Sequence, residues 1–535
     1  MSASSKRSEG HYSFSSSGGD DSPAAAAEEG AAEEGEVGEG EVEAAARAGF
    51  GNRLVPKGWA RGLAQRHPVP YHLAEALLAR FKREGRTKKE ATRKAGRALG
   101  SRLARAEDVE LIKTEASRSG SADVIDHVEA TFDAGRGEPV ARLSRLGLSK
   151  VPLEGRLAEE HDRLLKGGFY ADVQLTYEGQ GGGPPFKISG LEPLRASAAE
   201  PLRQIQEGRP AFSDGAWLYF LARSIGLAAP TDVLGPRPLA LALLRLVPLA
   251  QENYCLLELG PRQTGKTFIH EELSPQAHVL SSGTATPAQL IVDTRTEEPG
   301  LLATSDVVCF DEVTTATGLE EIASALKGYL SSGAARRGRE EIQGRASVVM
   351  IGNIDRPVEE ILAEEILGEE TLGEEGHLFE PLPEALGEDT AFMDRVSAFL
   401  PGWEVPKLGR EHLATGPALP SATLAEALAQ LRRLDYISAL KPRLELTGNL
   451  TERDRAAVWK TISGLVKLIY PSPDGPPSVV SEEVLRWAAW LGLEMRLRVR
   501  AQQRQLQPEE FSEGNFGFRL GGDGKTVAAS LPEAS

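Results

Sequence analysis

The sequence predicts an α/β fold with an open parallel sheet, and three strand-like apolar runs carry that prediction. Helical stretches separate the runs, which are residues 254–260, 307–312 and 347–353, and the second and third runs end on polar residues. Strands that alternate with helices pair in parallel, so the residues after their carboxyl ends meet at one edge of the sheet. We therefore expect the functional groups at that edge.

The first run leads into a glycine-rich loop with the pattern Gly260-x4-Gly265-Lys266-Thr267, and residues 268–272 continue as a helix. Phosphates need inward-facing backbone N–H groups, glycines that allow close approach, and a helix N-terminus. In such a loop Lys266 contacts the β- and γ-phosphates of ATP and the Thr267 hydroxyl ligates Mg²⁺. The expected nucleotide-binding residues are Gly260, Pro261, Arg262, Gln263, Thr264, Gly265, Lys266 and Thr267.

Two acidic residues end the second run, and the first of them stands 45 residues after Lys266. Asp311 ends a buried strand and is expected to hold Mg²⁺, and Glu312 is the expected general base for an attacking water. Taken alone, an Asp-Glu pair could be an ordinary strand end. Its pairing with a phosphate loop favours ATP hydrolysis.

Asn353 and Arg395 recur at equal spacing, each 42 residues after the preceding group. Asn353 can orient the water between Glu312 and the γ-phosphate, or simply form a turn. Arg395 can act as an arginine finger toward a neighbouring subunit's nucleotide, or form a structural salt bridge.

The composition predicts a soluble protein of two or three domains, since the chain has 535 residues. Its formal net charge of −17 excludes a wholly basic nucleic-acid-binding protein. The two cysteines, Cys255 and Cys309, lie in apolar runs, so we expect reduced core residues and a cytoplasmic location. No apolar run reaches membrane-spanning length, and no signal peptide is recognisable.

Opposite charges are segregated in the first 105 residues. Residues 1–46 carry 11 acidic side chains against Lys6 and Arg7 and predict a disordered tail. Residues 47–105 carry 16 Lys or Arg against only three Glu, and the apolar spacing in 71–81 predicts helices. This segment is either a solvated cationic face or a surface that contacts nucleic-acid phosphates.

The cations of this segment are not interleaved with aromatic residues, which argues against base stacking. On the nucleic-acid interpretation, the densest part comprises Arg80, Lys82, Arg83, Arg86, Lys88, Lys89, Arg93, Lys94 and Arg97.

Further along the chain, residues 122–134, 169–179 and 184–194 predict strands of a small β module, and 216–227 and 238–249 predict helices.

The order phosphate loop, Asp-Glu, Asn and Arg resembles that of the AAA+ ATPases. Several longer segments make the resemblance closer: GNRLVPKGWARGL at 51–63, FYADVQLTYEG at 169–179, FDEV at 310–313, GNI at 352–354 and PGWEVPK at 401–407. Together they are similar to the BrxL family, the Lon-like ATPases of BREX phage-defence systems. The resemblance covers nearly the whole chain from about residue 48.

The resemblance implies a homo-oligomeric ring, a hexamer or stacked rings, that binds ATP, Mg²⁺ and DNA and acts with other BREX components. It implies that Arg453 is a sensor arginine touching the γ-phosphate, with Arg455 as the alternative. Residues 331–345 would form a hairpin whose Arg336, Arg337 and Arg339 meet DNA in the ring's channel, or a surface loop of mixed charge.

On this basis four parts are expected. They are an acidic tail (1–46), a basic helical and β-containing DNA-binding domain (47–212), an AAA+ core (213–408), and a helical lid with a small C-terminal extension (409–535).

Two segments depart from the family pattern. Family members commonly carry a C-terminal Lon-type protease domain, whereas about 65 residues follow the helix expected at 460–470. The segment PDGPPS at 473–478 resembles a Lon nucleophile, but it lacks the adjacent lysine, and Lys525 lies in an expected hairpin turn. The acidic repeat at 362–376 is expected to be a solvated loop.

The preferred interpretation is therefore an ATP-hydrolysing, DNA-binding ring protein that couples hydrolysis to DNA binding or translocation. Two alternatives stay open: an ATP-dependent protease or unfoldase, and a non-enzymatic scaffold on DNA that assembles with ATP.

Overall fold

The fold is described by a computed structural model from residue 37 to residue 531, apart from internal gaps. The gaps are residues 134, 166, 180–184, 197–199, 230–233, 276, 282–284, 294–297, 317–318, 338–339, 355–377, 380, 477–479 and 522–524. Four features expected from the sequence lie outside the described residues. They are the tail up to residue 36, the acidic repeat at 362–376, Arg339 and Ser478.

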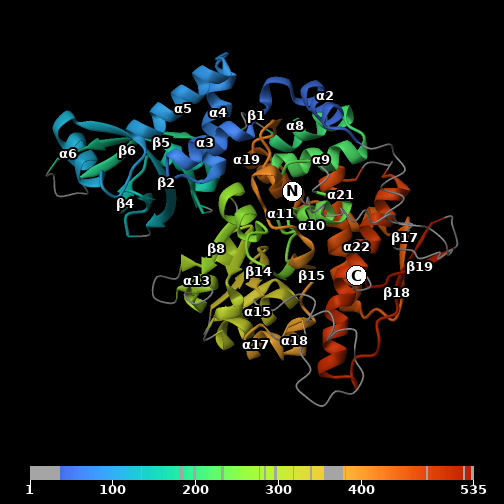
Figure 1. Ribbon diagram of the computed structural model, residues 1–535. Helices are drawn as coiled ribbons and strands as arrows, with labels where there is room; N and C mark the ends of the chain where they lie inside the picture. Colours follow the sequence, from blue (N-terminus) through green and yellow to red (C-terminus); the bar gives the residue numbers. More distant parts are fainter. Residues whose placement is uncertain are drawn as a thin grey trace, which may run out of the picture.

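A five-stranded parallel sheet forms the centre of the molecule and confirms the predicted α/β fold (Figure 1). Its strand order is β15-β7-β14-β11-β8, and all neighbouring strands run parallel. The strands are β7 (Cys255–Gly260), β8 (Ala277–Ser281), β11 (Val307–Asp311), β14 (Ser347–Asn353) and β15 (Ala398–Pro401). Both cysteines are buried in it and free, as predicted.

Alternate residues of these strands point to opposite faces of the sheet and enter two hydrophobic clusters. In β7, Leu256 belongs to the first cluster and Leu257 to the second. The helices α9 (Asp214–Ser224), α10 (Pro236–Leu244), α11 (Val247–Ala250), α19 (Ser421–Leu431), α21 (Glu452–Ile469) and α22 (Glu482–Leu506) contribute to the first cluster. The second includes α13 (Pro287–Leu290), α14 (Leu301–Thr304), α15 (Glu320–Ser332), α17 (Glu384–Gly387) and α18 (Thr390–Met393).

The single helix expected at 238–249 is wrong, because the structure divides it into α10 and α11. Pro248 stands in the first turn of α11. A proline there has no N–H to continue the hydrogen bonds of a preceding helix, but it fits the start of a new one.

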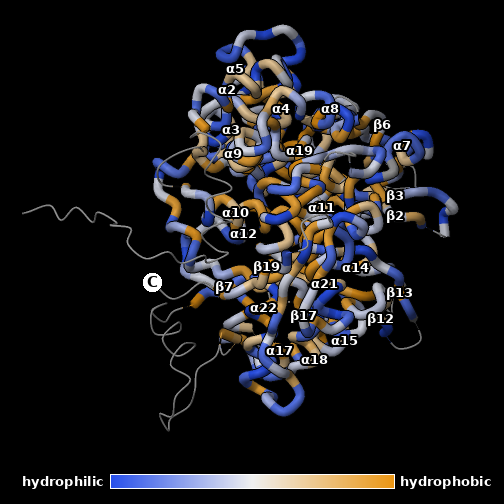
Figure 2. The backbone as a smooth tube through the Cα atoms, turned by 90° about the vertical axis from the view of Figure 1, so that its right-hand side faces the viewer, coloured by the Kyte–Doolittle hydropathy of each residue, from blue (hydrophilic) through white to orange (hydrophobic). Residues whose placement is uncertain are grey.

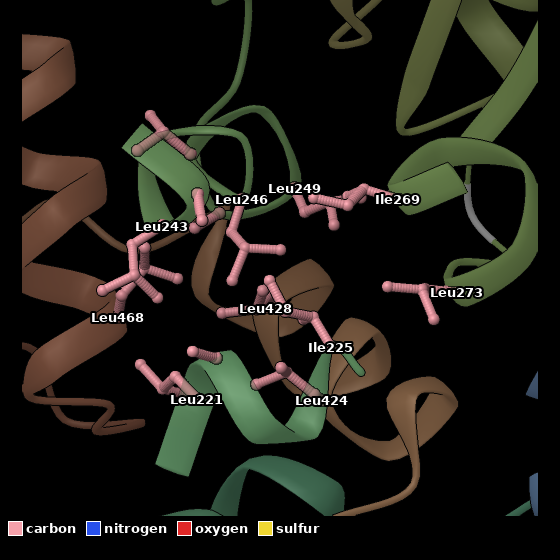
Figure 3. Close-up of a cluster of buried hydrophobic side chains, with 14 of the residues drawn as sticks. Leu221, Ile225, Leu243, Leu246, Leu249, Ile269, Leu273, Leu424, Leu428 and Leu468 are labelled. Carbon is pink, nitrogen blue, oxygen red and sulfur yellow. The ribbon is translucent and has the colours of Figure 1, made fainter. Parts of the chain in front are cut away.

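The turn after the phosphate loop is anchored in the first cluster (Figure 3). It consists of α12 (Lys266–Phe268) and the π-helical turn η4 (Ile269–Leu273). Ile269 and Leu273 point toward the side chains that α11 and α19 contribute, including Leu249 and Leu428. Apolar contacts of the following turn therefore hold the C-terminal end of the phosphate loop in place.

The expectation of a disordered tail up to residue 46 is wrong from residue 39 onward. Helix α2 spans Glu39–Phe50 and buries Val42, Ala46 and Phe50, which recur every four residues and form one stripe. The Phe50 ring stacks on Phe220 of α9 with a centroid separation of 5.4 Å. An apolar stripe within acidic sequence is therefore enough to dock this helix.

Three further helices form the basic part of the chain: α3 (Lys57–Arg66), α4 (Tyr71–Arg83) and α5 (Lys88–Arg102). Helix α6 (Val109–Ser119) follows them. Helix α5 begins with a capping box in which Thr87 and Glu90 satisfy each other's backbone N–H groups. The buried side chains of α3, α4 and α5 belong to the same cluster as those of α9 and α19. The basic helices thus share a core with the helices of the central sheet.

A second, antiparallel sheet follows, in the order β4-β3-β2-β5-β6. Its strands are β2 (Ser121–Asp133), β3 (Glu138–Leu143), β4 (Leu148–Pro152), β5 (Phe169–Tyr177) and β6 (Phe186–Pro193). The strands predicted near 122–134, 169–179 and 184–194 are confirmed as β2, β5 and β6. This sheet has its own hydrophobic cluster and lies on one side of the molecule in Figure 1.

On the opposite side, β17 (Leu444–Gly448), β18 (Phe516–Leu520) and β19 (Thr526–Ala528) form a small antiparallel sheet beside α22. The pairing of β18 with β19 confirms the hairpin expected around Lys525. Within the described ranges, no helix has the length and apolar character that crossing a membrane requires. Polar and apolar segments alternate along the tube in Figure 2.

Short elements complete the chain. The helical ones are η1 (Gly51–Arg53), α7 (Gly155–Glu160), η2 (Asp162–Leu165), α8 (Pro201–Gly208), η3 (Arg209–Ala211), η6 (Val313–Thr315), η7 (Gly402–Glu404), η8 (Arg410–His412) and α20 (Ile437–Leu440). The extended ones are β1 (Val55–Pro56), β9 (Val292–Asp293), β10 (Glu298–Pro299), β12 (Ala334–Arg337), β13 (Glu340–Gln343) and β16 (Pro417–Ala418).

A fully buried ion pair joins the basic helices to the helices over the central sheet. Lys57 Nζ of α3 lies 2.5 Å from Glu75 Oε1 of α4 and donates a hydrogen bond of 2.6 Å to the carbonyl oxygen of Ser224 in α9. The other Glu75 oxygen accepts hydrogen bonds of 2.6 Å from the backbone N–H and hydroxyl of Ser421 in α19. Four helices therefore meet at one pair of charges.

Candidate nucleotide-binding site

The phosphate loop connects β7 to α12 at the carboxyl edge of the central sheet. Gly265 and Gln263 have φ angles of +78° and +71°, and a glycine reaches the first of these without steric cost. At Gly260, an added Cβ would lie 2.6 Å from the backbone of Gly402, so only glycine fits there. Both glycines of the sequence pattern are therefore required by the backbone of the loop.

Lys266 lies inside this loop and is almost fully buried. Its Nζ donates hydrogen bonds to the carbonyl oxygens of Gly260 (2.8 Å) and Pro261 (2.7 Å), and it lies 3.2 Å from Asn353 Oδ1. Burial lowers the pKa of Lys266, and the carboxylates of Glu258 and Asp311 oppose that shift. The structure thus brings Lys266 and Asn353 together at the edge expected from the sequence.

Thr267 and Asp311 are also brought together. The Thr267 hydroxyl donates a hydrogen bond of 3.0 Å to Asp311 Oδ2, across 44 residues of sequence. The other Asp311 oxygen accepts a hydrogen bond of 2.9 Å from the backbone N–H of Glu312. A hydroxyl and a carboxylate are oxygen ligands of the kind that Mg²⁺ prefers in nucleotide sites, where substrate phosphates and waters supply the rest. The described residues contain no cluster of three or more His, Cys, Asp or Glu side chains that could hold a metal alone.

Glu312 has an uncommon backbone conformation. Its φ and ψ are 57° and 38°, which place a non-glycine residue in the left-handed region, and its side chain is exposed. Such a conformation costs about 1–3 kcal/mol and is concentrated at functional sites. The turn ends β11 abruptly, so the Glu312 backbone leaves the sheet directly after Asp311.

A buried ion pair lies directly beneath the loop, and the sequence analysis missed it. Arg245, in the turn between α10 and α11, contacts both oxygens of Glu258 in β7 at 2.6 and 3.0 Å. The same guanidinium donates a hydrogen bond of 2.9 Å to the carbonyl oxygen of Thr264. The available signal was a lone arginine and a lone glutamate, each inside an apolar run. This pair fixes the position of the loop backbone.

Arg395 and Arg453 lie together at the opposite edge of the sheet. Arg395 precedes β15, whose parallel pairing with β7 puts Ala398 beside Leu256 near the start of that strand. Arg453, at the start of α21, contacts the carboxylate of Asp394, the neighbour of Arg395. The six residues of β7 separate this edge from the loop by about 17 Å. Neither arginine therefore reaches the loop of its own chain.

The alternative sensor, Arg455, is engaged elsewhere. Its guanidinium donates a hydrogen bond of 2.7 Å to the carbonyl oxygen of Leu446 in β17. Arg395 itself donates one of 2.8 Å to the carbonyl oxygen of Lys327 in α15. It forms no described salt bridge, so the structural alternative considered for it is not observed.

The basic side chains expected to contact DNA fall into two groups. Those on α4 are engaged within the protein: Arg80 pairs with Glu192 at 2.7 Å, Lys82 donates to the carbonyl oxygen of Leu54, and Arg83 donates to that of Ala196. On α5, no described carboxylate lies within ion-pair distance of Lys88, Lys89, Arg93, Lys94 or Arg97. The α5 cations are therefore available to an external anion.

The hairpin expected at 331–345 is confirmed as β12 and β13. Arg336 is highly exposed and pairs with Glu341 of the facing strand at 2.5 Å. Arg337 donates a hydrogen bond of 2.6 Å to the carbonyl oxygen of Val292. Of these two arginines, Arg336 thus projects toward solvent and Arg337 is held against the protein.

Comparisons with known families match nearly the whole chain. The family described as "BREX system Lon protease-like protein BrxL N-terminal" matches residues 48–177. The family described as "Lon-like protease BrxL-like, ATPase domain" matches residues 186–517. The chain belongs to the BrxL family. The gap between the two BrxL matches lies between β5 and β6, before the expected boundary at residue 212.

Two curated BrxL proteins are similar over most of this chain. The chain is 34% identical over 477 residues to the Lon-like protease BrxL of Bacillus cereus (strain H3081.97). The aligned region covers 88% of this chain and 68% of that protein. It is 31% identical over 484 residues to the Lon-like protease BrxL of Escherichia coli O9:H4 (strain HS). The aligned region covers 89% of this chain and 67% of that protein. The BrxL ATPase match contains the loop, Asp311, Glu312, Asn353, Arg395 and Arg453.

Proposed function

We propose that this BrxL-family protein is an ATP-hydrolysing, DNA-binding AAA+ protein that works as a homo-oligomeric ring in BREX-type phage defence. One observation carries the ATPase part: Lys266, Thr267, Asp311, Glu312 and Asn353, which come from three separate segments, meet at one edge of the parallel sheet. A site with this composition fits phosphoryl transfer to water.

Each residue has a distinct part in the proposed reaction. The Lys266 ammonium exchanges the carbonyls of Gly260 and Pro261 for the β- and γ-phosphate oxygens of ATP. Thr267 and Asp311 would hold Mg²⁺, which neutralises the charge that develops on the phosphates. Glu312 accepts the proton of the attacking water, and Asn353 orients that water toward the γ-phosphate.

Arg395 and Arg453 complete the site of a neighbouring subunit in this proposal. Both lie at the far edge of the sheet from their own loop, and an arginine that contacts the γ-phosphate stabilises the charge of the transition state. A head-to-tail interface repeats such a contact around a closed ring. The position of the two arginines supports assembly, and it gives every active site residues from two subunits.

The substitution Glu312→Gln tests the hydrolytic part. It removes the base but keeps the size and polarity of the side chain, so ATP binding should persist and turnover should fall about 10²- to 10⁴-fold. Glu388→Gln is the matched control, because Glu388 is an exposed carboxylate outside the site. Retained turnover in Glu312→Gln would contradict the assignment. A wild-type protein that binds ATP without any turnover would instead support the scaffold alternative.

The DNA part rests on the unpaired cations of α5 and on the exposed Arg336. Each phosphate that such a cation neutralises releases counterions, so binding should weaken steeply with salt. Turnover measured with and without duplex DNA across a salt series tests this part. Neither stimulation nor salt-dependent binding would remove DNA from the proposal, while the ATPase assignment would stand.

Proteolysis is the second candidate, because the printed names of both relatives describe a Lon-like protease. Incubation of an unfolded polypeptide with the protein and ATP distinguishes the two functions. Degradation that Ser478→Ala abolishes would establish the protease alternative. An intact substrate under conditions of active ATP turnover would support the ATPase without proteolysis.

A further inference from the structure

Helices α3 and α5 flank an open groove that the sequence did not reveal. Its volume is about 790 Å³, within the range of sites that hold small ligands. Its lining includes an indole ring and several cations, together with His67, Thr92 and three glycines. The residues that carry the argument are Trp59, Gly62, Lys89, Arg93, Gly96 and Arg97.

Trp59 is the aromatic member of this groove. Its side chain is 40% exposed, whereas the five other tryptophans of the chain are buried or half-buried. Within the described part of the chain, no aromatic ring stacks on it and no cation lies over it. Its exposed indole face offers a surface of the kind on which unpaired bases stack.

The cations of the groove are equally unoccupied. Lys89, Arg93 and Arg97 recur at spacings of four on α5, so they lie along one side of the helix next to the groove. None of them has a described carboxylate within ion-pair distance. A row of unpaired cations beside an aromatic face matches a strand that presents phosphates along its backbone and a base at its side.

The glycines keep the groove open. Gly62 and Gly96 both have helical backbones, where glycine is less stable than alanine by about 0.5–1 kcal/mol. An added Cβ at Gly62 would meet only the Arg66 guanidinium, at 3.9 Å, so packing does not demand glycine there. A larger side chain at that position would instead take up space in the groove, because Gly62 lines it.

We propose that the α3–α5 groove binds a single-stranded DNA segment, with one unpaired base stacked on Trp59 and the flanking phosphates on Lys89, Arg93 and Arg97. This inference rests on the proposed DNA-binding function and names the form of DNA that the site selects. A duplex keeps its base faces stacked inside and could use only the cations. The groove therefore distinguishes an opened strand from a closed one.

Three fluorescent probes of equal length test the proposal: an oligo(dT) strand, an abasic strand of the same charge, and a duplex. Wild-type protein should bind oligo(dT) more tightly than the abasic strand. Trp59→Ala should weaken oligo(dT) binding about 5- to 150-fold, the loss typical of one stacked base, and leave the other two probes unchanged. Trp59→Phe should recover most of the oligo(dT) affinity.

Gly62→Leu provides an independent variant. It fills the groove at a position where a side chain favours the helix, so its thermal unfolding midpoint should stay at or above that of the wild type. It should nevertheless lose the preference for oligo(dT) over the abasic strand. An unchanged preference in both Trp59→Ala and Gly62→Leu would overturn the stacking site. Wild-type protein that binds none of the three probes would instead remove the underlying DNA-binding function.

Discussion

Glu272, five residues after Thr267, accepts a hydrogen bond of 2.7 Å from the backbone N–H of Tyr71, the first residue of α4. The contact is extended on both sides. The Tyr71 ring lies 5.9 Å from that of Phe268, and His72 Nδ1 lies 3.0 Å from the carbonyl oxygen of Glu272. The turn that follows the phosphate loop therefore touches the basic helices directly.

This contact predicts that nucleotide and DNA binding are coupled through Glu272. In Glu272→Ala the charge-assisted hydrogen bond to Tyr71 is lost, so stimulation of ATP turnover by DNA should fall severalfold, within the 5- to 150-fold range typical of coupling between sites. Glu272→Gln is the control, because its amide oxygen can still accept the bond. Equal stimulation in wild type and Glu272→Ala would rule out this route of coupling.

The buried pair of Arg245 and Glu258 predicts that a single substitution lowers folding stability more than the double substitution does. Arg245→Leu leaves the Glu258 carboxylate buried without its partner and should cost about 3–5 kcal/mol of folding stability. The double variant Arg245→Leu/Glu258→Leu removes both charges and should recover most of that loss. It still lacks the donor to Thr264, so the loop should be less well fixed and ATP binding should remain weaker than in the wild type. Thermal unfolding and ATP titration separate the two effects.

The edge that carries Arg395 predicts complementation between inactive subunits. Lys266→Ala and Arg395→Ala should each abolish turnover alone. In an equal mixture, about a quarter of the junctions join an intact loop from one variant to an intact arginine from the other, so turnover should partly return. A mixture of Lys266→Ala with Glu312→Gln should stay inactive, because both residues belong to the same side of the junction. Equal behaviour of the two mixtures would contradict the shared site.

The two groups of basic residues predict different salt dependences of DNA binding. Arg93→Gln on α5 should lower the slope of log affinity against log salt by about 1, as expected for one lost phosphate contact. Arg80→Gln should leave the slope unchanged, because Arg80 is paired with Glu192. The same duplex and the same salt series serve for both variants. A reduced slope for Arg80→Gln would place the DNA on α4 instead.

The candidate site could be predicted because the direction of the parallel strands places most of its residues. Asp311 and Asn353 each end an apolar run, and parallel pairing alone brings them to the loop that ends β7. A position at the carboxyl end of a parallel strand was therefore a sufficient guide to proximity in space. The same argument predicts nothing about side chains that meet through helix packing, such as Arg245 and Glu258.

The basic segment shows the limit of a charge count. Arg80 and Lys89 count equally in the charge of the segment. Arg80 pairs with Glu192, in a strand that begins about a hundred residues later, whereas Lys89 has no described carboxylate within ion-pair distance. The expectation that aromatic residues do not take part covered residues 47–105, because the sequence shows no aromatic residues interleaved with the cations. Trp59 lies on α3 and reaches the groove lined by the α5 cations only through tertiary packing. Helix α2 was not predicted because its apolar stripe is narrow and lies in a segment composed largely of glutamate and alanine.

The ion pair of Lys57 and Glu75 has a mechanical consequence. Lys57 is the first residue of α3, two residues before Trp59, and its charge is enclosed together with Glu75 between α4, α9 and α19. Sliding α3 away from α4 would separate two fully buried charges, at a cost of about 3–5 kcal/mol, and sliding α3 past α9 would break the hydrogen bond from Lys57 to Ser224. We therefore expect α3 and α9 to move as one rigid body. Any displacement that ATP turnover imposes on the helices over the central sheet would carry the α3–α5 groove, and a strand held in it, through the same distance.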